Sequence, residues 1–247
     1  MLLTIVTITY NAGQTIGRTL KSVERQTCAQ DIEHIIVDGA SKDNTVDLAL
    51  EYKQRNPARR IIVVSEPDHG LYDAMNKGLH MAQGTYICFL NAGDKLHETT
   101  TIEHIKPMMQ RAMYGVIYGD TDIVDTEGHF IRKRHLTPPQ NLTPRSFSDG
   151  MLVCHQSFYA LRRLCPDYDL RYRFSADVDW CIRVMKEGER QGLTNHNMHA
   201  VLTDYLDEGI TTKNHCASLI ERFNVMRHHY GLTTTIGKHV TFLFRQH

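Results

Sequence analysis

The sequence predicts an α/β fold built on a mainly parallel central sheet that is flanked by helices. Two observations predict it. Between Leu3 and Leu90, short runs of apolar and β-branched residues alternate with segments whose apolar residues recur at helical spacing. Polar segments rich in Gly, Asn and Asp follow several of the apolar runs, as expected where strands end. Alternation of this kind is typical of βαβ units, whose strands pair in parallel.

The first half of the chain divides into regular elements. Helices are predicted at Thr15–Arg25, from Asn44 or Thr45 through Tyr52, and at Leu71–Met81, and strands are predicted at Leu3–Thr9, Ile32–Val37, Arg60–Ser65 and Thr85–Leu90. The carboxyl ends of parallel strands meet at one edge of a sheet, so the polar segments that follow them should gather there. Turn amides and helix N-termini at such an edge can bind the phosphates of a nucleotide.

The second half is less regular. We expect a strand at Gly115–Asp125 with a hairpin partner at Gly128–Arg134, and a loop at Thr137–Asp149. An amphipathic helix should begin near Ser175 and end near Gly188. A further helix is predicted at Ala217–Tyr230.

Composition and missing motifs exclude several classes of protein. Lys plus Arg and Asp plus Glu both number 28, so the net charge does not favour nucleic acid as a partner. The six cysteines form no Cys-x-x-Cys pair and are typical of reduced thiols. No apolar run approaches the roughly 18–20 residues that span a bilayer, and the first residues are expected to form a strand rather than a signal peptide. Gly-x-Gly-x-x-Gly and the P-loop motif are absent. We therefore expect a cytoplasmic protein.

Seven segments resemble the motifs of glycosyltransferase family 2, whose members are inverting enzymes with the GT-A fold, a Rossmann-like sheet flanked by helices. In chain order they are Thr7–Asn11, Val37–Thr45, Glu66–Asp94, Tyr118–Asp120, His155-Gln156, Ser175–Trp180 and Glu208–Thr211. The chain is most similar to soluble bacterial members that build surface polysaccharides. The resemblance implies one catalytic domain over residues 1–212, with a nucleotide-sugar half (1–95) and an acceptor half (96–212). Residues 213–247 should form a helical extension.

The resemblance also implies a donor site. It assigns Thr9, Tyr10, Asn11, Asp38 and Asp68 to the nucleoside, Asn76 and Lys77 to the rim of the sugar or diphosphate, and Asn91 to the sugar or the cation. Asp94 is the metal-side carboxylate for Mg²⁺ or Mn²⁺, because hard cations bind carboxylate oxygens. The segment Asn91-Ala-Gly-Asp94 departs from the family's Asp-x-Asp motif, since it has one carboxylate. Plain alternatives exist: a turn residue for Asp38 or Asp94, and a solvated helix face for Asn76 and Lys77.

On the acceptor side, Asp177 matches the family's general base, although Ala176 replaces the glutamate that usually precedes it. Asp179 is the reserve candidate, and both carboxylates could instead favour the start of a helix through its dipole. His155 and Gln156 are either substrate contacts or a satisfied core pair. Gly209, Thr211 and Thr212 suggest a loop that closes over the diphosphate.

Together these assignments predict hexosyl transfer from a UDP-sugar to a saccharide or lipid-linked saccharide, with inversion, in surface polysaccharide biosynthesis. The alternatives are a non-catalytic nucleotide-sugar-binding module and, less favoured, a nucleotidyltransferase. The tail Lys238–Arg245 is apolar and basic. It is either a peripheral contact with the inner face of a membrane or a packed terminal strand or helix. The sequence predicts neither the sugar nor the oligomeric state.

Overall fold

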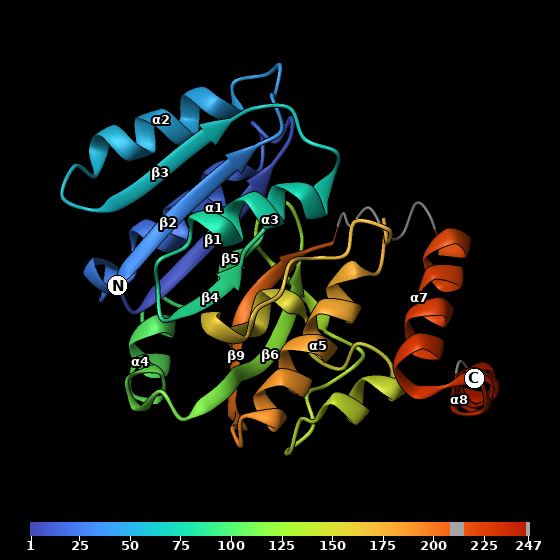
Figure 1. Cartoon of the computed structure of the whole chain (residues 1–247). Coiled ribbons are helices and arrows are strands. Elements are labelled where there is room, and N and C mark those ends of the chain that lie inside the picture. The colour runs from blue at the N-terminus through green and yellow to red at the C-terminus, as the bar shows by residue number, and fades with distance from the viewer. Residues whose placement is uncertain (208–214, 246–247) are drawn as a thin grey trace.

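The computed structural model describes residues 1–207 and 215–245, and Figure 1 shows a central sheet with helices around it. The strands are β1 Leu3–Thr9, β2 Ile32–Asp38, β3 Arg60–Ser65, β4 Tyr86–Phe89, β5 Lys95–Leu96, β6 Tyr114–Val124, β7 Phe130–Lys133, β8 Phe158–Leu161 and β9 Thr194–Leu206. The helices are α1 Ile16–Glu24, α2 Thr45–Arg55, α3 Leu71–Met81, α4 Thr101–Arg111, α5 Ala176–Arg190, α7 His215–Tyr230 and α8 Leu232–Arg245. Short 3-10 turns include η2 Pro144–Asp149 and η3 His155–Ser157.

The sheet has two differently paired halves. Its first four strands follow the order β3-β2-β1-β4, and every pairing among them is parallel. This confirms the α/β class and the parallel first half. Beyond β4 the pairing is mixed, because β8 is antiparallel to both β4 and β6, β9 is parallel to β6, and β5 and β7 add antiparallel edges.

Helices cover both faces of the parallel half. In β2, Ile36 packs on one face with Ile16 of α1 and Tyr52 of α2. Its neighbour Ile35 points to the other face, as alternation along a strand requires, and belongs to the main core together with Met75 of α3. Both faces being apolar explains why the strand has no polar alternation in the sequence.

Several elements were not predicted, among them α4, β9 and η2. Helix α4 contains Pro107 in its interior, a residue that normally ends a helix. Strand β9 reads TNHNMHAVLTDYL and is largely polar in its first half. The 3-10 turn η2 lies inside the segment that the sequence predicts to be a loop, with Pro144 at its first position.

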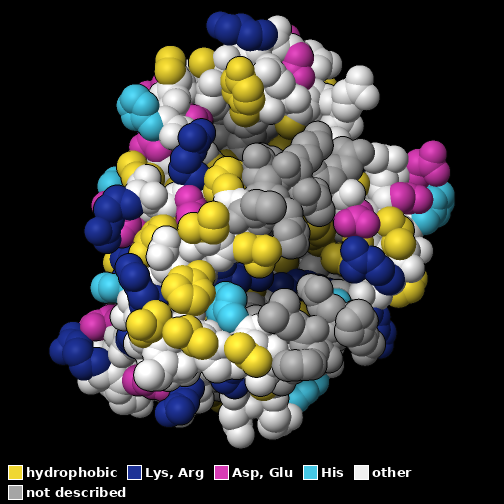
Figure 2. Space-filling model, turned by 90° about the vertical axis from the view of Figure 1, so that its right-hand side faces the viewer, with side chains coloured by type: hydrophobic (Ala, Val, Ile, Leu, Met, Phe, Trp, Pro, Cys, Tyr) yellow, Lys and Arg dark blue, Asp and Glu magenta, His cyan; other side chains and the backbone are white. Residues whose placement is uncertain are grey.

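Helices α7 and α8 occupy the right-hand side of Figure 1, beyond α5. The tail is therefore helical, and Lys238 of α8 pairs with Asp149 of η2 (Nζ–Oδ1 2.6 Å). Along α8, Leu232, Ile236 and Val240 are exposed at four-residue spacing. Figure 2 shows this side of the molecule, where hydrophobic and basic side chains lie close together. Among the described residues, no helix has an apolar stretch long enough to cross a membrane.

Candidate active site

Hydrogen bonds join the loops that follow β1 and β2. The backbone N–H of Asn11 donates to Ser41 Oγ (2.7 Å), and the N–H of Lys42 donates to Asn11 Oδ1 (2.8 Å). The N–H of Gly13 donates to Asp43 Oδ2 (2.9 Å). Asn11 itself has a positive φ of 48°, a conformation that asparagine tolerates better than most residues. These bonds form the polar edge that the sequence predicts at the ends of neighbouring parallel strands.

Asp38 organises this edge from within. Its buried carboxylate accepts the Ser41 hydroxyl (2.5 Å) and N–H (2.9 Å) and the Ser65 hydroxyl (2.7 Å). These contacts are the ones expected if Asp38 is a turn residue, which is the plain alternative to nucleoside binding. Since a carboxylate can accept about four hydrogen bonds, one acceptor position remains beyond these three.

Tyr10, Gly39 and Asp68 meet beside Asp38. A methyl group on Gly39 would come within 2.5 Å of Asp68 Oδ2 and 3.4 Å of the Tyr10 ring, so only glycine leaves room for both side chains. The Tyr10 ring is 64% exposed. Lys77 fixes the segment that carries Asp68, because its ammonium donates to Pro67 O (2.8 Å) and pairs with a neighbouring glutamate. Lys77 therefore acts on Asp68 through the backbone of that segment.

Asn76 lies elsewhere, and its contacts do not support the donor-rim expectation. Its side chain is 8% exposed and bonds the backbone of Tyr168 at both ends: Nδ2 donates to Tyr168 O (3.0 Å), and Tyr168 N–H donates to Oδ1 (2.7 Å). Tyr168 stacks between Tyr72 and Trp180 (ring centroids 5.5 and 4.9 Å). Asn76 thus holds an aromatic stack in place through the backbone of Tyr168.

The turn after β4 carries both satisfied and unsatisfied oxygens. Asp94 is 4% exposed, and its oxygens accept the Leu206 N–H (3.0 Å) and Gln156 Nε2–H (2.7 Å). Burial raises the pKa of Asp94 to about 6, against the lowering effect of these bonds. In contrast, Asn91 Oδ1 and Thr9 Oγ1 are buried without a hydrogen-bond partner. Unpaired buried oxygens are costly, so two at neighbouring strand ends indicate a place for a ligand.

Asp177, at the start of α5, lies next to this turn in space. Its Oδ2 is 3.4 Å from His155 Nδ1, and His155 Nε2 is 3.3 Å from Asn91 Nδ2. The Tyr72 hydroxyl donates to Asp177 Oδ1 (3.2 Å). Burial tends to raise the pKa of Asp177, but the His155 bond and the charges of His155 and Arg222 outweigh it and hold the pKa below its usual value. Asp177 is therefore an ionised carboxylate at neutral pH, 15% exposed in its side chain.

Gln156 and Asp179 lie apart from Asp177. Gln156 is fully buried and bonds Cys154 Sγ (2.7 Å) as well as Asp94. For Gln156, these contacts favour the satisfied core residue over the substrate contact. Asp179 is buried in ion pairs with Arg183 and His229 (both 2.7 Å). These contacts leave the reserve role of Asp179 without structural support, because Arg183 and His229 occupy both of its oxygens.

Sequence reasoning did not find Tyr72, the second partner of Asp177. A signal existed, since Tyr72 lies four residues before Asn76 in a predicted helix and therefore on the same face. Arg222 and His229, which act on Asp177 and Asp179 from α7, had no sequence signal. The predicted closing loop at Gly209, Thr211 and Thr212 lies outside the described residues.

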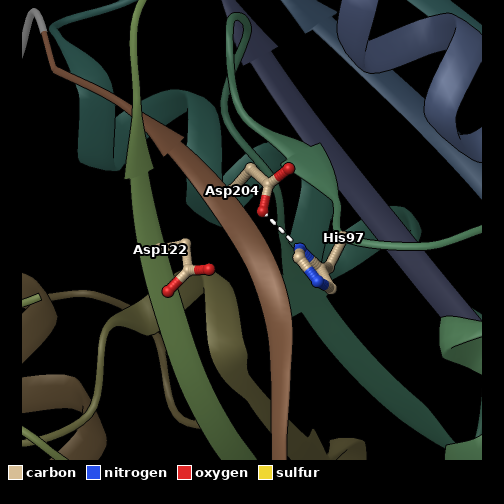
Figure 3. A group of neighbouring side chains, drawn as sticks. All are labelled: His97, Asp122 and Asp204. Carbon is tan, nitrogen blue, oxygen red and sulfur yellow. Dashed lines mark hydrogen bonds and ion pairs between the residues drawn. The ribbon is translucent and has the colours of Figure 1, made fainter. Parts of the chain in front are cut away.

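A group of possible metal ligands lies elsewhere. Within the described part of the chain, His97, Asp122 and Asp204 place ligand atoms within 4.8 Å of one another (Figure 3). Asp204 already pairs with His97 (2.6 Å) and with a lysine. Thr203, the preceding residue of β9, donates to Gln156 O (2.9 Å). Because neighbouring strand residues point to opposite faces, this group lies across the sheet from His155 and Gln156.

Three comparisons agree on the family and the fold. The profile of the family described as "Glycosyl transferase family 2" matches residues 4–164. A Mycobacterium bovis protein named "PGL/p-HBAD biosynthesis glycosyltransferase" is 32% identical over 213 residues, covering 83% of this chain and 77% of that protein.

Solved structures extend the likeness. S. aureus TarS in complex with UDP-GlcNAc has a TM-score of 0.72 at 16% identity, over 93% of this chain and 65% of that one, so the chain spans slightly less than two thirds of it. The Pyrobaculum calidifontis mannosyltransferase PcManGT, in complex with GDP-Man and Mn²⁺, has a TM-score of 0.62 at 15% identity, over 96% and 73%. These likenesses confirm the GT-A fold. With a family profile matched over more than half its length and a relative of this identity, the chain belongs to glycosyltransferase family 2.

Proposed function

We propose that this protein transfers a hexosyl group from a UDP-sugar to a hydroxyl of a saccharide or lipid-linked saccharide, with inversion at the anomeric carbon. The observation that carries the proposal is the line of contacts from Asp177 through His155 to Asn91. It joins an ionised carboxylate of the second half to the polar edge of the first half. An acceptor hydroxyl and a nucleotide sugar brought to these two ends would meet between them.

The proposed reaction is a single displacement. Asp177 takes the proton of the acceptor hydroxyl as that oxygen bonds to the anomeric carbon, and the bond from this carbon to the diphosphate breaks with its electron pair leaving on the diphosphate. A carboxylate that is ionised at neutral pH is ready for this role. Tyr10, Asp38 and Asp68 form the floor for the nucleoside, with Asn11 closing the loop beside them.

A divalent cation fits the turn only together with the donor. Asn91 Oδ1 is a buried oxygen without a partner, as a ligand to a cation or a sugar hydroxyl would require. Asp94 is the one carboxylate of the turn, and both of its oxygens already accept hydrogen bonds. Mg²⁺ and Mn²⁺ normally bind six ligands in octahedral geometry, so the diphosphate and water must supply most of the oxygens. When bound, the cation would offset the charge of the leaving diphosphate.

Release of UDP tests the function and the cation together. We expect UDP to be released from at least one UDP-sugar when Mn²⁺ or Mg²⁺ is present, and EDTA to suppress that release until the cation is restored in excess. Without a nucleotide, Mn²⁺ should bind no tighter than millimolar by calorimetry, because the turn offers too few free oxygens. Unchanged turnover in EDTA would contradict the cation's role. Binding of a nucleotide sugar without any turnover would favour a non-catalytic binding module.

The relative that is named for PGL/p-HBAD biosynthesis supports an acceptor that is itself an intermediate of a biosynthetic pathway. The exposed residues of α8, Leu232, Ile236 and Val240, could contact the surface of a bilayer that carries a lipid-linked acceptor. Such a contact would be peripheral.

A further inference from the structure

His155 connects the two sides of the proposed site through its two ring nitrogens. Nδ1 lies 3.4 Å from Asp177 Oδ2, and Nε2 lies 3.3 Å from Asn91 Nδ2. The side chain is only 11% exposed, so water does not compete strongly for either nitrogen. The imidazole therefore bridges the residue proposed as the base and the residue proposed to meet the donor.

The neighbours of the ring determine where its proton lies. Asn91 Nδ2 carries only hydrogens, so Nε2 must accept from it, and the neutral ring then keeps its proton on Nδ1. If the Asn91 amide is rotated, Oδ1 gains the partner that it otherwise lacks by accepting from an N–H on Nε2, and an N–H on Nδ1 is still needed beside the Asp177 carboxylate. In both arrangements Nδ1 carries a proton on the side of the ring that lies 3.4 Å from Asp177 Oδ2, a contact with the distance of an ion pair.

The segment η3 that carries His155 is anchored to the sheet on both sides. Thr203 of β9 donates to Gln156 O (2.9 Å), and Ser157 Oγ bonds Thr121 Oγ1 of β6 (2.7 Å). These bonds are fully buried. A ring held by such a segment has a fixed position relative to Asp177, as a group that orients another must have.

We propose that His155 is a positioning residue. It holds the Asp177 carboxylate through its Nδ1–H and connects that carboxylate to Asn91 in the turn after β4. The proposal rests on the proposed function, in which Asp177 is the base. His155 neither receives nor releases a proton in the reaction: the acceptor proton goes to Asp177, and the Nδ1–H stays on the ring. With the Tyr72 hydroxyl and the Val178 N–H on Oδ1 and His155 beside Oδ2, rotation of the carboxylate is restricted.

Several other groups also act on the titration of Asp177. Those facing it are the Tyr72 hydroxyl from α3, the Arg222 guanidinium from α7, and the neutral thiols and phenols of Cys154, Tyr168, Cys181 and Tyr205. Of these, only Arg222 is a cation. Without the imidazole, burial is opposed by Arg222 and by neutral hydrogen bonds, so the pKa of Asp177 rises. Since the base must be ionised, the acid limb of the pH profile then moves to higher pH.

The test compares His155→Ala, His155→Asn and a matched control, His80→Ala. His80 also pairs with an aspartate, Asp167 (2.7 Å), but both side chains are 61% exposed, whereas His155 is 11% exposed. We expect His155→Ala to lower kcat by about 10- to 100-fold, to leave the KM for the nucleotide sugar within about threefold, and to move the acid limb of kcat/KM upward. His155→Asn keeps an N–H near the place of Nδ1 and should recover most of kcat. His80→Ala should match the parent.

A ¹³C NMR titration of the Asp177 carboxyl, in the parent and in the His155 variants without substrate, gives a readout that does not need activity. We expect a higher pKa in His155→Ala than in His155→Asn. An unchanged pKa together with an unchanged acid limb would overturn the proposal, and so would a large rise in donor KM at constant kcat. If His155→Ala does not fold, His155→Asn serves as the test. The proposal would be overturned if this variant lost as much kcat as Asp177→Asn does while its acid limb and the carboxyl pKa of Asp177 stayed unmoved. Full transfer by Asp177→Asn would instead contradict the proposed base, while the titration would still report whether His155 acts on Asp177.

Discussion

Replacement of Asp177 by asparagine is expected to lower the rate of transfer by about 10²- to 10⁴-fold, the usual contribution of a general base. Asparagine has nearly the shape of aspartate and can still accept from Tyr72, but its amide cannot take the acceptor proton. Since the donor contacts lie on the other side of His155, the affinity for the UDP-sugar should stay within about threefold of the parent. UDP release in the presence of acceptor measures the first effect, and calorimetry measures the second.

A matched control for this variant is Asp167→Asn. Asp167 is an exposed aspartate whose partner is the exposed His80, so its replacement should change neither rate nor affinity. Full activity in Asp177→Asn would eliminate Asp177 as the base. A parallel loss of donor affinity would indicate that Asp177 binds the donor.

Replacement of Asn76 by alanine is expected to have the largest effect on stability. It removes both partners of the Tyr168 backbone and leaves a buried N–H and a buried C=O without hydrogen bonds. At about 1–3 kcal/mol for each of the two unsatisfied groups, the free energy of unfolding should fall by about 2–6 kcal/mol. Urea denaturation measures this change, and the donor affinity of the folded protein should remain close to that of the parent.

Asn224→Ala is the control for Asn76→Ala, because Asn224 is also helical but exposed. Its effect should lie within about 0.5 kcal/mol. If Asn76→Ala kept its stability and lost donor affinity, Asn76 would belong to the donor rim after all.

The first half of the fold is predictable because its strands are covered on both faces. Ile35 and Ile36 point to opposite layers and are both apolar, so β2 contains the uninterrupted apolar run Ile35–Val37. The second half lacks this signal. In β9 polar side chains find partners that the sequence does not display, such as the Pro139 carbonyl that accepts from Asn197 Nδ2 (3.1 Å). A proline disfavours the interior of a helix, so Pro107 obscured α4 in the sequence. In the structure, Ile102, Ile105 and Met109 pack into the core, and this packing outweighs the effect of the proline.

Candidate site residues are predictable as types and in order, but their partners are not. The resemblance pointed to Asn91, His155 and Asp177 separately, and only the structure reveals that they touch. Asn76 illustrates the opposite case. A polar residue on a predicted helix has the same sequence signal whether it faces a ligand or bonds a backbone 92 residues away, as Asn76 does with Tyr168. Burial of a polar side chain is a property of the tertiary structure.

The anomeric configuration of the first product, followed by ¹H NMR, tests most directly whether Asp177 acts as a base in a single displacement. With an α-linked UDP-sugar, the base and acceptor approach from the face opposite the diphosphate, so the newly formed bond should be β. A β product from the parent protein is the predicted result. An α product would contradict it, because retention requires a different route, such as attack by a nucleophilic side chain followed by a second displacement.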